Sequence, residues 1–490
     1  MTKIIDILLN RSFNILFPIA LGTFRILAYL LLRLIPSFFY KPYKQKHINK
    51  DDNNNYTKED VTYIIPIYMP EEDLKMCLVS WIKNQPKEII LVPDISCEKE
   101  VTEIKNTVLE EMSENNIPNI RIISETRPGK RRALATGYEN TNTEIIIFVD
   151  DDVWHCDTML ENLIIPFNDK KRNTGGVGPG QICRSKRKKY NIWEIIMDMR
   201  LFQRYLEIKA TTFFGGGSPC IAGRTMAWRK SMLDETNFVE DFLNETFMGK
   251  KQLSGDDKYL TRLCINSDYG MYHQMSKDCY VSTRFEDPPV LFYQLLRWGR
   301  NTIRSDIKLI CLERKVWCKY PFLAVVMVDR FLTPFTMFIG LILALVYGNI
   351  ELFYLILLYI FVIRTFKLIP YFTYFKPKLK YNYRFIPYVP IFILATYAGA
   401  LLKLWALFSL NNRKWGNREV KVNDNDEIVR TGIMENFNQE EILDEINMEE
   451  IDIVDICIID DNELKKNEFS NINPERQEIL LQLENRIIDF

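Results

Sequence analysis

The sequence predicts an α/β domain with a mostly parallel β-sheet, fused to interfacial and transmembrane α-helices. Between residues 61 and 285, short and continuously apolar stretches alternate with helical patterns. Strands that are buried on both faces of a parallel sheet have this pattern. Long apolar segments lie before and after this region, and about 20 apolar residues suffice to cross a bilayer. Carboxylates follow directly after two of the apolar stretches, at Asp94 and Asp150.

Residues 1–50 are expected to anchor the chain in a membrane. Residues 12–40 are mostly apolar, which is enough for one tilted transmembrane helix or two very short ones. Arg25 and Arg33 interrupt the segment and no small-residue cleavage site follows, so a retained anchor is favoured over a signal peptide. The segment ends in a basic patch made of Lys41, Lys44, Lys46 and Lys50. By the positive-inside rule, the following domain, residues 57–285, faces the cytosol.

Four buried strands are predicted in this domain, at residues 61–66, 88–92, 121–123 and 144–149. Helical patterns separate them, for example at residues 72–81 and 99–112. Parallel sheets of this kind bind ligands at the carboxyl ends of their strands. Because Asp94 and Asp150–Asp152 follow two of the strands, we expect the ligand site at this edge of the sheet.

A second membrane region is expected after the α/β domain. Residues 286–318 mix apolar side chains with arginines, which is typical of amphipathic helices at a membrane surface, although an ordinary surface helix shares this pattern. Residues 319–410 contain apolar segments at 321–347, 350–369 and 385–410. Asp329-Arg330 leaves open whether the first of these begins as an interfacial helix and spans only from Phe331. The loop before the last segment carries Lys376, Lys378, Lys380 and Arg384, which places it in the cytosol.

The net charge of −1 hides a strong asymmetry along the chain. Residues 419–490 hold 21 acidic and 6 basic residues, so the rest of the chain carries a net charge of +14. The acidic tail is expected to be largely disordered. The basic body suits nucleotide diphosphates and anionic lipid, although a solvated surface also accounts for most of these charges.

Cysteine and histidine usage argues against several kinds of site. Ten cysteines are scattered along the chain without C-x-x-C pairs, which argues against a zinc ribbon and against a disulfide-stapled secreted module. The chain has three histidines, so a histidine-rich metal site is not expected.

The acidic triplet Asp150-Asp151-Asp152 is a candidate metal site. Asp150 and Asp152 lie two residues apart at a strand end, so both side chains can converge on one Mg²⁺ or Mn²⁺, with phosphate oxygens as further ligands. The middle residue, Asp151, is expected to point away. A solvated turn with an aspartate at a helix N-cap is the alternative.

Two further groups are candidates for nucleotide binding. Asp94 suits the base or the ribose of a nucleotide, and ordinary turn chemistry explains it equally well. The run from Arg127 to Arg132 is a turn that leads into a helix. Its cations and the helix N-terminus suit a diphosphate, and a plain basic surface turn is the alternative.

Candidates for the transfer chemistry follow later in the chain. Asp256 and Asp257 open a predicted helix, where one can cap the helix while the other projects as a general base; capping alone is the alternative. The glycine-rich run 213–220 lets a backbone approach a ligand or lets a loop move, and Cys220 within it is expected to be a buried small hydrophobe. Arg297 suits a phosphate and Trp298 a sugar ring, and anchoring at the membrane interface is the alternative for both.

With these residues assembled, the chain resembles the processive, membrane-bound family 2 glycosyltransferases, in particular hyaluronan synthases and fungal type 2 polysaccharide synthases. The resemblance covers about residues 60–418. Six motifs carry it: Ile65-Pro66-Ile67-Tyr68, Gly129-Lys130-Arg131, Asp150-Asp151-Asp152, Cys220-x-x-Gly223 with Arg229, Gly255-Asp256-Asp257 with Gln294-x-x-Arg297-Trp298, and Trp415-Gly416-Asn417-Arg418. The chain departs from hyaluronan synthases at Trp228 and Asn417, where they have Tyr and Thr.

The resemblance implies a GT-A-type fold for the α/β domain and a role for each motif. Asp257 is implied as the catalytic base, and Asp150 and Asp152 as ligands of Mg²⁺ or Mn²⁺. The residues implied in nucleotide binding are Pro66, Tyr68, Asp94, Lys130, Arg131, Asp150 and Arg297. Those implied in the donor and acceptor pocket are Cys220, Gly223, Asp256, Gln294, Arg297 and Trp298.

Residues 411–418 resemble a switch loop that lies on the cytosolic side in this family, and Trp415, Gly416 and Arg418 are its implied functional residues. Three full spans within residues 319–410 would place this loop outside the cytosol. One of the three apolar segments is therefore expected to be interfacial or re-entrant.

The expected protein is a multi-pass enzyme of the plasma membrane, a hexosyltransferase with its catalytic domain in the cytosol. It would polymerise UDP-sugars, GlcNAc with or without GlcA, into a β-linked polysaccharide and pass the chain through its own membrane helices. The expected partners are UDP-sugar donors, the growing polysaccharide and the lipid bilayer, and no nucleic acid. A chitin-like or other β-glycan synthase, or a non-processive transferase with a lipid-linked acceptor, is the alternative. A transporter or scaffold that only binds nucleotide is a rival of a different class.

Overall fold

The computed structural model describes residues 11–44, 55–112, 117–185, 187, 190–346, 350–373 and 385–412, together with two short strands, β12 (Lys421–Val422) and β13 (Ile428–Val429). Some predicted features lie outside the described residues. They are Lys46, Lys50, the basic loop with Lys376, Lys378, Lys380 and Arg384, the switch-loop residues Trp415, Gly416 and Arg418, and nearly all of the acidic tail.

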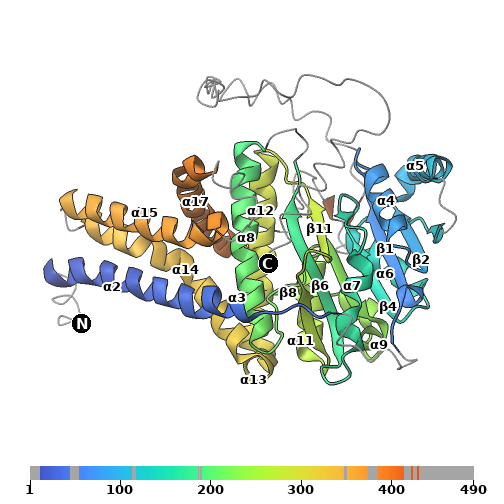
Figure 1. The fold of residues 1–490 in the computed structure, drawn as a ribbon, viewed down its shortest axis with the longest axis horizontal. Coiled ribbons are helices and arrows are strands. Elements are labelled where there is room, and N and C mark those ends of the chain that lie inside the picture. Colours follow the sequence, from blue (N-terminus) through green and yellow to red (C-terminus); the bar gives the residue numbers. More distant parts are fainter. Residues whose placement is uncertain are drawn as a thin grey trace.

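The α/β domain is built on one nine-stranded sheet (Figure 1). Four neighbouring strands run parallel in the order β3-β2-β1-β4. Their bounds are β1 (Val61–Ile67), β2 (Glu88–Pro93), β3 (Asn119–Ile122) and β4 (Ile145–Val149). These strands confirm the four predicted from the sequence.

Beyond β4 the sheet becomes mixed. The strand β7 (Thr225–Arg229) runs antiparallel to both β4 and β6 (Thr174–Cys183). Two strands pair parallel with β6, namely β10 (Gly270–Gln274) and β11 (Tyr280–Thr283), and β5 (Trp154–His155) closes the edge antiparallel to β11. The strands β3, β2, β1 and β4 are therefore parallel, as in sheets that bind nucleotides at their carboxyl ends. The mixed strands lie on the side that leads to the candidate membrane helices (Figure 1).

Helices cover both faces of the parallel strands and bury β1 and β4 completely. On one face, Tyr63 and Ile65 of β1 pack with Trp81 of α4 (Leu74–Lys83). On the other face, Ile64 packs with Leu134 of α6 (Lys130–Glu139). Because successive side chains of a strand point to opposite faces, a strand buried on both sides must be apolar at every position. This explains why β1 is apolar except at Thr62, whose buried hydroxyl accepts a hydrogen bond from Thr143 at 2.8 Å.

The other elements of the domain are short or lie at its rim. The helix α5 (Glu98–Glu111) and α4 match the two predicted helices to within two residues. The remaining elements are η3 (Lys58–Asp60), η4 (Ile95–Cys97), α7 (Met159–Leu163), η5 (Ile165–Asn168), α9 (Lys230–Asp234), α10 (Phe238–Leu243), β8 (Thr246–Phe247), β9 (Lys250–Lys251), α11 (Asp256–Asn266), η6 (Lys308–Glu313), α13 (Lys315–Lys319) and η7 (Ile386–Tyr388).

Four segments of the described chain are long and apolar enough to cross a membrane: Ile19–Phe39, Pro321–Leu343, Phe353–Phe372 and Ile386–Phe408. They are formed by α2 (Arg11–Tyr29) with η1 (Leu30–Leu34) and α3 (Ile35–Phe39), and by α14 (Pro321–Val346), α15 (Ile350–Thr373) and α17 (Val389–Phe408). In Figure 1, α2, α14 and α15 extend away from the sheet, and α8 (Ile192–Phe213) and α12 (Val290–Ile307) stand between these helices and the sheet.

The charged pair Asp329-Arg330 does not interrupt α14, because opposite charges surround it. Asp329 accepts hydrogen bonds from Arg25 and, at 3.2 Å, from Arg33. Arg330 lies 2.6 Å from Asp306 of α12 and 3.8 Å from Glu207 of α8. Ionisable groups in membrane segments are tolerated when they pair within the bundle. The two arginines that interrupt the apolar N-terminal sequence thus neutralise the acid of α14.

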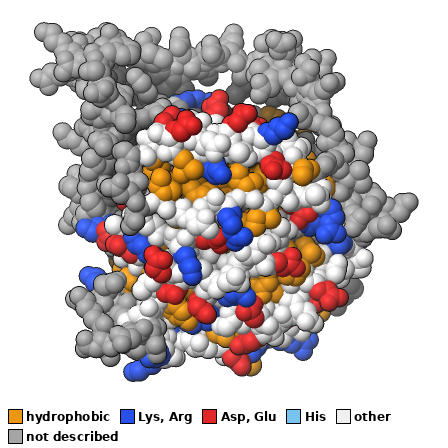
Figure 2. All heavy atoms as spheres, turned by 90° about the vertical axis from the view of Figure 1, so that its right-hand side faces the viewer, with side chains coloured by type: hydrophobic (Ala, Val, Ile, Leu, Met, Phe, Trp, Pro, Cys, Tyr) orange, Lys and Arg blue, Asp and Glu red, His pale blue; other side chains and the backbone are white. Residues whose placement is uncertain are grey.

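The face of the molecule opposite the candidate membrane helices has a different surface. Figure 2 shows acidic and basic side chains interspersed across it, as on a solvated protein surface. Large exposed apolar side chains are instead frequent on the candidate membrane segments, for example Leu345 of α14, Leu358 of α15 and Leu394 of α17. This distribution separates a charged end from an end with many exposed apolar side chains.

Replacement of Gly137 tests the packing of α6 on β1. A Cβ atom at this position would lie 2.2 Å from Cγ2 of Ile64. We expect Gly137→Ala to lower the free energy of unfolding by about 1–3 kcal/mol through overpacking, although alanine is the better helix former. Thermal unfolding of the detergent-solubilised protein measures the effect. Gly399→Ala in α17 is the control, because no heavy atom lies within 4 Å of a Cβ there; equal midpoints for both variants would contradict the prediction.

Candidate active site

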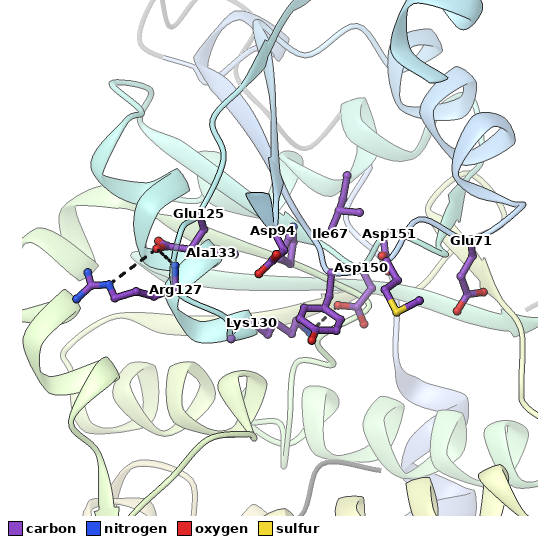
Figure 3. Close-up of a pocket in the computed structure, with 13 residues that line it drawn as sticks. Ile67, Glu71, Asp94, Glu125, Arg127, Lys130, Ala133, Asp150 and Asp151 are labelled. Atoms are coloured by element: carbon purple, nitrogen blue, oxygen red, sulfur yellow. Dashed lines mark hydrogen bonds and ion pairs between the residues drawn. The ribbon is translucent and has the colours of Figure 1, made fainter. Parts of the chain in front are cut away.

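A cavity opens where the parallel strands end, and we call it the strand-end cavity (Figure 3). It is lined by Pro66, Ile67, Tyr68, Met69, Glu71, Asp94, Glu125, Arg127, Gly129, Lys130, Ala133, Asp150 and Asp151. Five of the residues predicted for nucleotide binding are among them: Pro66, Tyr68, Asp94, Lys130 and Asp150. The parallel strands bring these residues together because their carboxyl ends lie at the same edge of the sheet.

Asp94 has a structural contact as well as a place in the cavity wall. Its Oδ1 accepts hydrogen bonds from the backbone nitrogen of Ser96 at 3.0 Å and from the Ser96 hydroxyl at 2.7 Å. These contacts cap η4, which is the turn chemistry considered as the alternative. Asp94 therefore has two roles: it caps the turn η4 and it lines the cavity.

Lys130 joins two carboxylates that are far apart in the sequence. Its Nζ lies 2.6 Å from Oδ1 of Asp150 at the end of β4 and 3.1 Å from Oδ2 of Asp256 at the start of α11. Burial raises the pKa of Asp150. At Asp256 burial acts in the same direction but Lys130 outweighs it, so the pKa of Asp256 is lowered. The two carboxylates likewise outweigh burial at Lys130 and raise its pKa, which favours the charged forms of Lys130 and Asp256.

The backbone at Gly223 lies beside this cluster. A Cβ atom on Gly223 would lie 3.4 Å from Oδ2 of Asp256, 3.5 Å from Cβ of Asp257 and 3.5 Å from Nζ of Lys130. A larger side chain would occupy the space between the lysine and the two aspartates. The predicted pocket residues Gly223 and Asp256 thus meet Lys130 at one point.

Asp257 is oriented by two hydrogen bonds near the start of α11. The chain enters this helix through Gly255, which has a φ of 82° that favours glycine. Oδ1 of Asp257 accepts from the backbone nitrogen of Lys258 at 2.8 Å, and Oδ2 accepts from the Cys220 thiol at 3.2 Å. Burial and the neighbouring Asp257 raise the pKa of Cys220 to about 12. Cys220 is therefore a buried, protonated donor to the carboxylate. Its burial agrees with the small buried hydrophobe predicted from the sequence, whereas the contact with Asp257 was not predicted.

The acidic triplet differs in one respect from the prediction. Asp151 does not point away, since it lines the strand-end cavity beside Glu71 (Figure 3). The described turn after β4 exposes Asp150 and Asp151 to the cavity, whereas Asp152 is not among the lining residues. Burial, Asp150 and Glu71 raise the pKa of Asp152 to about 7. The expectation that alternate residues face the same way fails because strand geometry ends at Val149.

The triplet offers the ligand type that a hard divalent cation takes. Within the described residues, no group of three or more His, Cys, Asp or Glu side chains forms a ready-made metal site. Carboxylate oxygens are the preferred protein ligands of Mg²⁺ and Mn²⁺, and such ions commonly take their other ligands from water and substrate phosphates. The mutual repulsion that raises the pKa of Asp152 would be relieved by a cation. The residues therefore fit a cation that is shared with a bound diphosphate.

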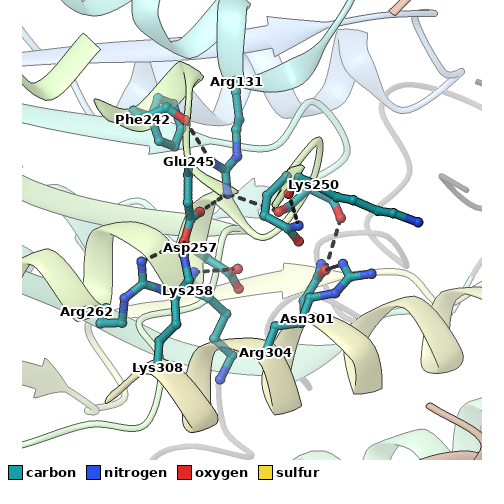
Figure 4. A network of polar contacts seen from close by, with 12 residues as sticks. Arg131, Phe242, Glu245, Lys250, Asp257, Lys258, Arg262, Asn301, Arg304 and Lys308 are labelled. Carbon is teal, nitrogen blue, oxygen red and sulfur yellow. Dashed lines mark hydrogen bonds and ion pairs between the residues drawn. The ribbon is translucent and has the colours of Figure 1, made fainter. Parts of the chain in front are cut away.

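Arg131 is not where the sequence predicted. It does not line the strand-end cavity, and its guanidinium instead reaches Oε2 of Glu245 at 2.7 Å (Figure 4). Glu245 also lies 2.6 Å from Arg262 and 2.8 Å from Lys308. Burial opposes the charged form of Glu245, but the three cations lower its pKa to about 2. Because a helix places neighbouring residues on different faces, Lys130 faces the cavity while Arg131 enters this buried network.

Glu245 is a residue that the sequence reasoning missed. Its partners Arg131, Arg262 and Lys308 belong to α6, to α11 and to η6, which continues α12. These are the helices that carry Lys130, Asp257 and Trp298. The Glu245 carboxylate therefore ties together the three helices that bear the candidate chemistry. A single acid in an ordinary polar stretch gives no local signal for this role.

The helix α12 carries the predicted residues Gln294, Arg297 and Trp298, none of which lines the strand-end cavity. The Trp298 ring packs at the edge of a buried cluster that contains Phe285. It also lies 5.6 Å from the guanidinium carbon of Arg224. Arg224 is a second residue that the sequence reasoning missed, and it connects α12 with the acidic triplet because its carbonyl accepts from the backbone nitrogen of Asp150 at 3.0 Å.

The polar side of α12 binds the end of the last candidate membrane helix. Nε of Arg300 donates to the Ser409 hydroxyl at 3.0 Å. Arg304 donates to the carbonyl of Leu410 at 2.5 and 3.0 Å and to that of Asn412 at 2.7 Å. The two arginines thus hold the turn that follows α17, Arg300 through a hydroxyl and Arg304 through two carbonyls. Residues 286–318 were predicted to form amphipathic helices at a membrane surface. In the structure, the charged side chains of Arg300 and Arg304 face α17.

The site combines groups that serve transfer from a nucleotide. An oriented carboxylate, Asp257, stands beside a lysine that is bound to two acids. The acidic triplet and the strand-end cavity lie on the other side of that lysine, so a diphosphate bound at the triplet would lie close to the carboxylate. Such a site can hold an anionic leaving group and take a proton from an attacking hydroxyl.

Comparisons with known proteins agree with this arrangement. Residues 59–301 match the family described as glycosyltransferase like family 2. A type 2 glycosyltransferase of Zymoseptoria tritici is 30% identical over 405 residues, which cover 79% of this chain and 80% of the relative. A hyaluronan synthase of Streptococcus pyogenes is 24% identical over 289 residues, which cover 58% of this chain and 64% of the relative. The structure of a mannosyltransferase from Pyrobaculum calidifontis, in complex with GDP-Man and Mn²⁺, superposes with a TM-score of 0.53 at 16% identity and covers 82% of this chain and all of that one.

The Glu245 network predicts a stability effect that depends on pH. Glu245→Gln leaves three cations without their shared carboxylate, and we expect it to lower the free energy of unfolding by about 3 kcal/mol at pH 7. The folded pKa of Glu245, about 2, lies below the value of about 4.3 for an unfolded chain. Its stabilisation is therefore complete above about pH 5 and is lost as the pH falls towards 2.

Denaturation of both proteins across this pH range measures the difference, which should shrink below pH 4. Glu111→Gln is the control, because its ion pair with Lys75 is exposed on both sides and should contribute about 0.5 kcal/mol at most. A variant difference that stays constant between pH 7 and pH 3 would show that the carboxylate charge is not what stabilises the network.

Proposed function

Because the chain belongs to glycosyltransferase family 2 and has a GT-A-type domain, we propose that it is a processive, inverting polysaccharide synthase. It extends a β-linked polysaccharide from UDP-sugars and passes the product through its own membrane helices. The proposed donors are UDP-GlcNAc, with or without UDP-GlcA, and the proposed product is hyaluronan-like. The likeness to a hyaluronan synthase over 58% of this chain supports this choice of product.

One observation carries the proposal: the helix of the transfer site is bonded directly to a candidate membrane helix. Trp298 lies on α12 two residues before Arg300 and six before Arg304, and these arginines donate to Ser409, Leu410 and Asn412 just after α17. A sugar chain that grows at this site is therefore next to the candidate membrane helices. A transferase that releases its product after each transfer has no need of this attachment.

Asp257 is the proposed general base. The acceptor hydroxyl attacks the anomeric carbon, the bond from that carbon to the diphosphate oxygen breaks, and the hydroxyl proton passes to Asp257. The hydrogen bonds from Cys220 and from the Lys258 backbone fix the carboxylate for this step. Inversion needs no protein nucleophile, which agrees with the protonated thiol of Cys220. The donor and acceptor sugars are proposed to lie against Gly223, Asp256, Gln294, Arg297 and Trp298.

The nucleotide is proposed to occupy the strand-end cavity. Pro66, Tyr68 and Asp94 would contact the nucleoside, and Lys130 the diphosphate. Asp150 and Asp152 are proposed to hold Mg²⁺ or Mn²⁺, with Asp151 close enough in the cavity wall to assist. The cation, when bound, supplies positive charge that stabilises the leaving diphosphate. Trp415, Gly416 and Arg418, which lie outside the described residues, are proposed to belong to a switch loop.

The proposed location is the plasma membrane, with the catalytic domain in the cytosol. The chain has four segments that are apolar and long enough to span, and the first is followed by Lys41 and Lys44. A basic flank favours the cytosolic side, where UDP-sugars are made available to the site.

Replacement of Asp257 tests the base. We expect Asp257→Asn to lower kcat by about 10²–10⁴-fold, the usual contribution of a general base, and to leave the affinity for UDP within about twofold. Initial rates of sugar transfer and equilibrium binding of UDP measure the two effects. Asp268→Asn just beyond α11 is the control, because that side chain is 96% exposed. Turnover that survives in Asp257→Asn would remove the base assignment.

The product is tested with isolated membranes that receive labelled UDP-GlcNAc and Mg²⁺, with and without UDP-GlcA. We expect polymer that requires both donors and is degraded by hyaluronidase. Polymer from UDP-GlcNAc alone, degraded by chitinase, would identify a chitin-like synthase instead. Transfer of single sugars to lipid without any polymer would contradict the processive proposal.

A further inference from the structure

The glycine-rich run 213–220 ends in Cys220, whose thiol donates to the carboxylate of Asp257. Gly215 and Gly216 within the run have φ values of 96° and 91°, which favour glycine, the residue with the greatest backbone freedom. A run of this kind holds one shape only where contacts with other elements compensate the entropy that it loses. The position of the thiol therefore depends on the side chains that contact the run from outside.

Two of these contacts come from α11, the helix that carries the proposed base. Nζ of Lys258 donates to the carbonyl of Pro219 at 3.0 Å, and the hydroxyl of Thr261 accepts from the backbone nitrogen of Ile221 at 3.0 Å. They bind the residues on either side of the cysteine and keep the run close to α11.

The contacts from the sheet come from β10 and meet at Ser218. Oγ of Ser218 lies 2.7 Å from Nε2 of His273 and accepts from the backbone nitrogen of Cys220 at 3.3 Å. The backbone nitrogen of Ser218 donates to Sδ of Met271 at 3.1 Å. Ser218 and His273 are 0% and 2% exposed, and a hydrogen bond between buried groups is costly to leave unmade. His273 therefore fixes the Ser218 hydroxyl and, through it, the backbone of Cys220.

The fold provides a fitted place for His273. It pairs in register with Gly178 of β6, where a Cβ atom would lie 2.7 Å from Cε1 and 2.8 Å from Nδ1 of the imidazole. The hydroxyl of Tyr40, directly after the first candidate membrane segment, donates to the carbonyl of His273 at 2.7 Å. Burial lowers the pKa of His273 to about 3. The ring is therefore neutral near pH 7 and contributes a hydrogen bond rather than a charge.

We propose that His273 and Ser218 are positioning residues for the transfer reaction: they fix the backbone of Cys220, and through its thiol they orient the carboxylate of Asp257. The thiol lies 3.2 Å from Oδ2 of Asp257, and the direction of this bond changes with the backbone that carries the thiol. The proposal rests on the proposed function, because it takes Asp257 as the general base. Neither His273 nor Ser218 is proposed to touch the substrate.

The test is the initial rate of sugar transfer from UDP-GlcNAc, with UDP-GlcA and Mn²⁺ present, by the full chain in lipid nanodiscs. We expect His273→Phe, which keeps a ring, and Ser218→Ala to lower kcat about tenfold, the effect of one hydrogen bond. KM for the donor and the affinity for UDP should stay within about twofold, because the strand-end cavity is untouched. His273→Gln should recover most of the loss, because an amide can donate or accept.

A double-mutant cycle shows whether the effect passes through the thiol. In a Cys220→Ala background, His273→Phe and Ser218→Ala should each change kcat by less than about twofold, because the group through which they act is gone. His155→Phe is the matched control, since His155 is also buried and its Nε2 lies 3.0 Å from the hydroxyl of Thr225. Its effect on kcat should be the same in both backgrounds.

Two failures can be told apart. Unchanged kcat in His273→Phe and Ser218→Ala, or an equal loss with and without the Cys220 thiol, overturns the positioning role and leaves the proposed function standing. If His273→Phe does not fold, as judged by thermal unfolding, Ser218→Ala decides the matter through the same cycle. Wild-type protein that transfers sugar from neither donor overturns the proposed function, and the positioning role falls with it.

Discussion

The arrangement of the site depends on the pairing of Lys130 with Asp150 and Asp256. This contact joins the end of β4 to the start of α11 through the first residue of α6. A buried lysine without these acids would be strongly destabilised, and the acids without the lysine would repel each other. The three groups therefore fix one another, and Gly223 lies beside them, where even a Cβ atom would be in contact with Asp256 and Lys130. Asp257, the neighbour of Asp256, is oriented as a consequence.

The need to pair buried charges also shapes two other parts of the molecule. Behind the site, Glu245 lies within 2.8 Å of cations from three elements. In the membrane region, Asp329 and Arg330 are compensated by Arg25, Arg33, Glu207 and Asp306. Charges withdrawn from water have to be paired, and here the pairs join different elements of the fold. Charge compensation thus connects the catalytic domain, the helices α8 and α12, and the membrane helices.

This connection gives α12 a double role in the proposed mechanism. Its first half presents Trp298 to the transfer site, and its second half binds the end of α17 through Arg300 and Arg304. A movement of α17 would act on the transfer site through a rigid helix. The proposed switch loop follows α17 directly in the sequence, so the same attachment would set where that loop begins.

The sequence by itself determined the parallel strands β1 to β4, the site edge with Asp94 and Asp150, and the apolar segments. Each of these is encoded within a few consecutive residues, by strand periodicity or by apolar length. It also predicted Lys130, Asp257 and Cys220 for the site, because a motif fixes a local turn or helix start. Only the tertiary structure decided that Arg131 leaves the cavity, that Asp151 lines it, and that Glu245 and Arg224 belong to the site. Arg131 and Glu245 are 114 residues apart, and a contact between such distant residues depends on how the helices pack, which no local pattern contains.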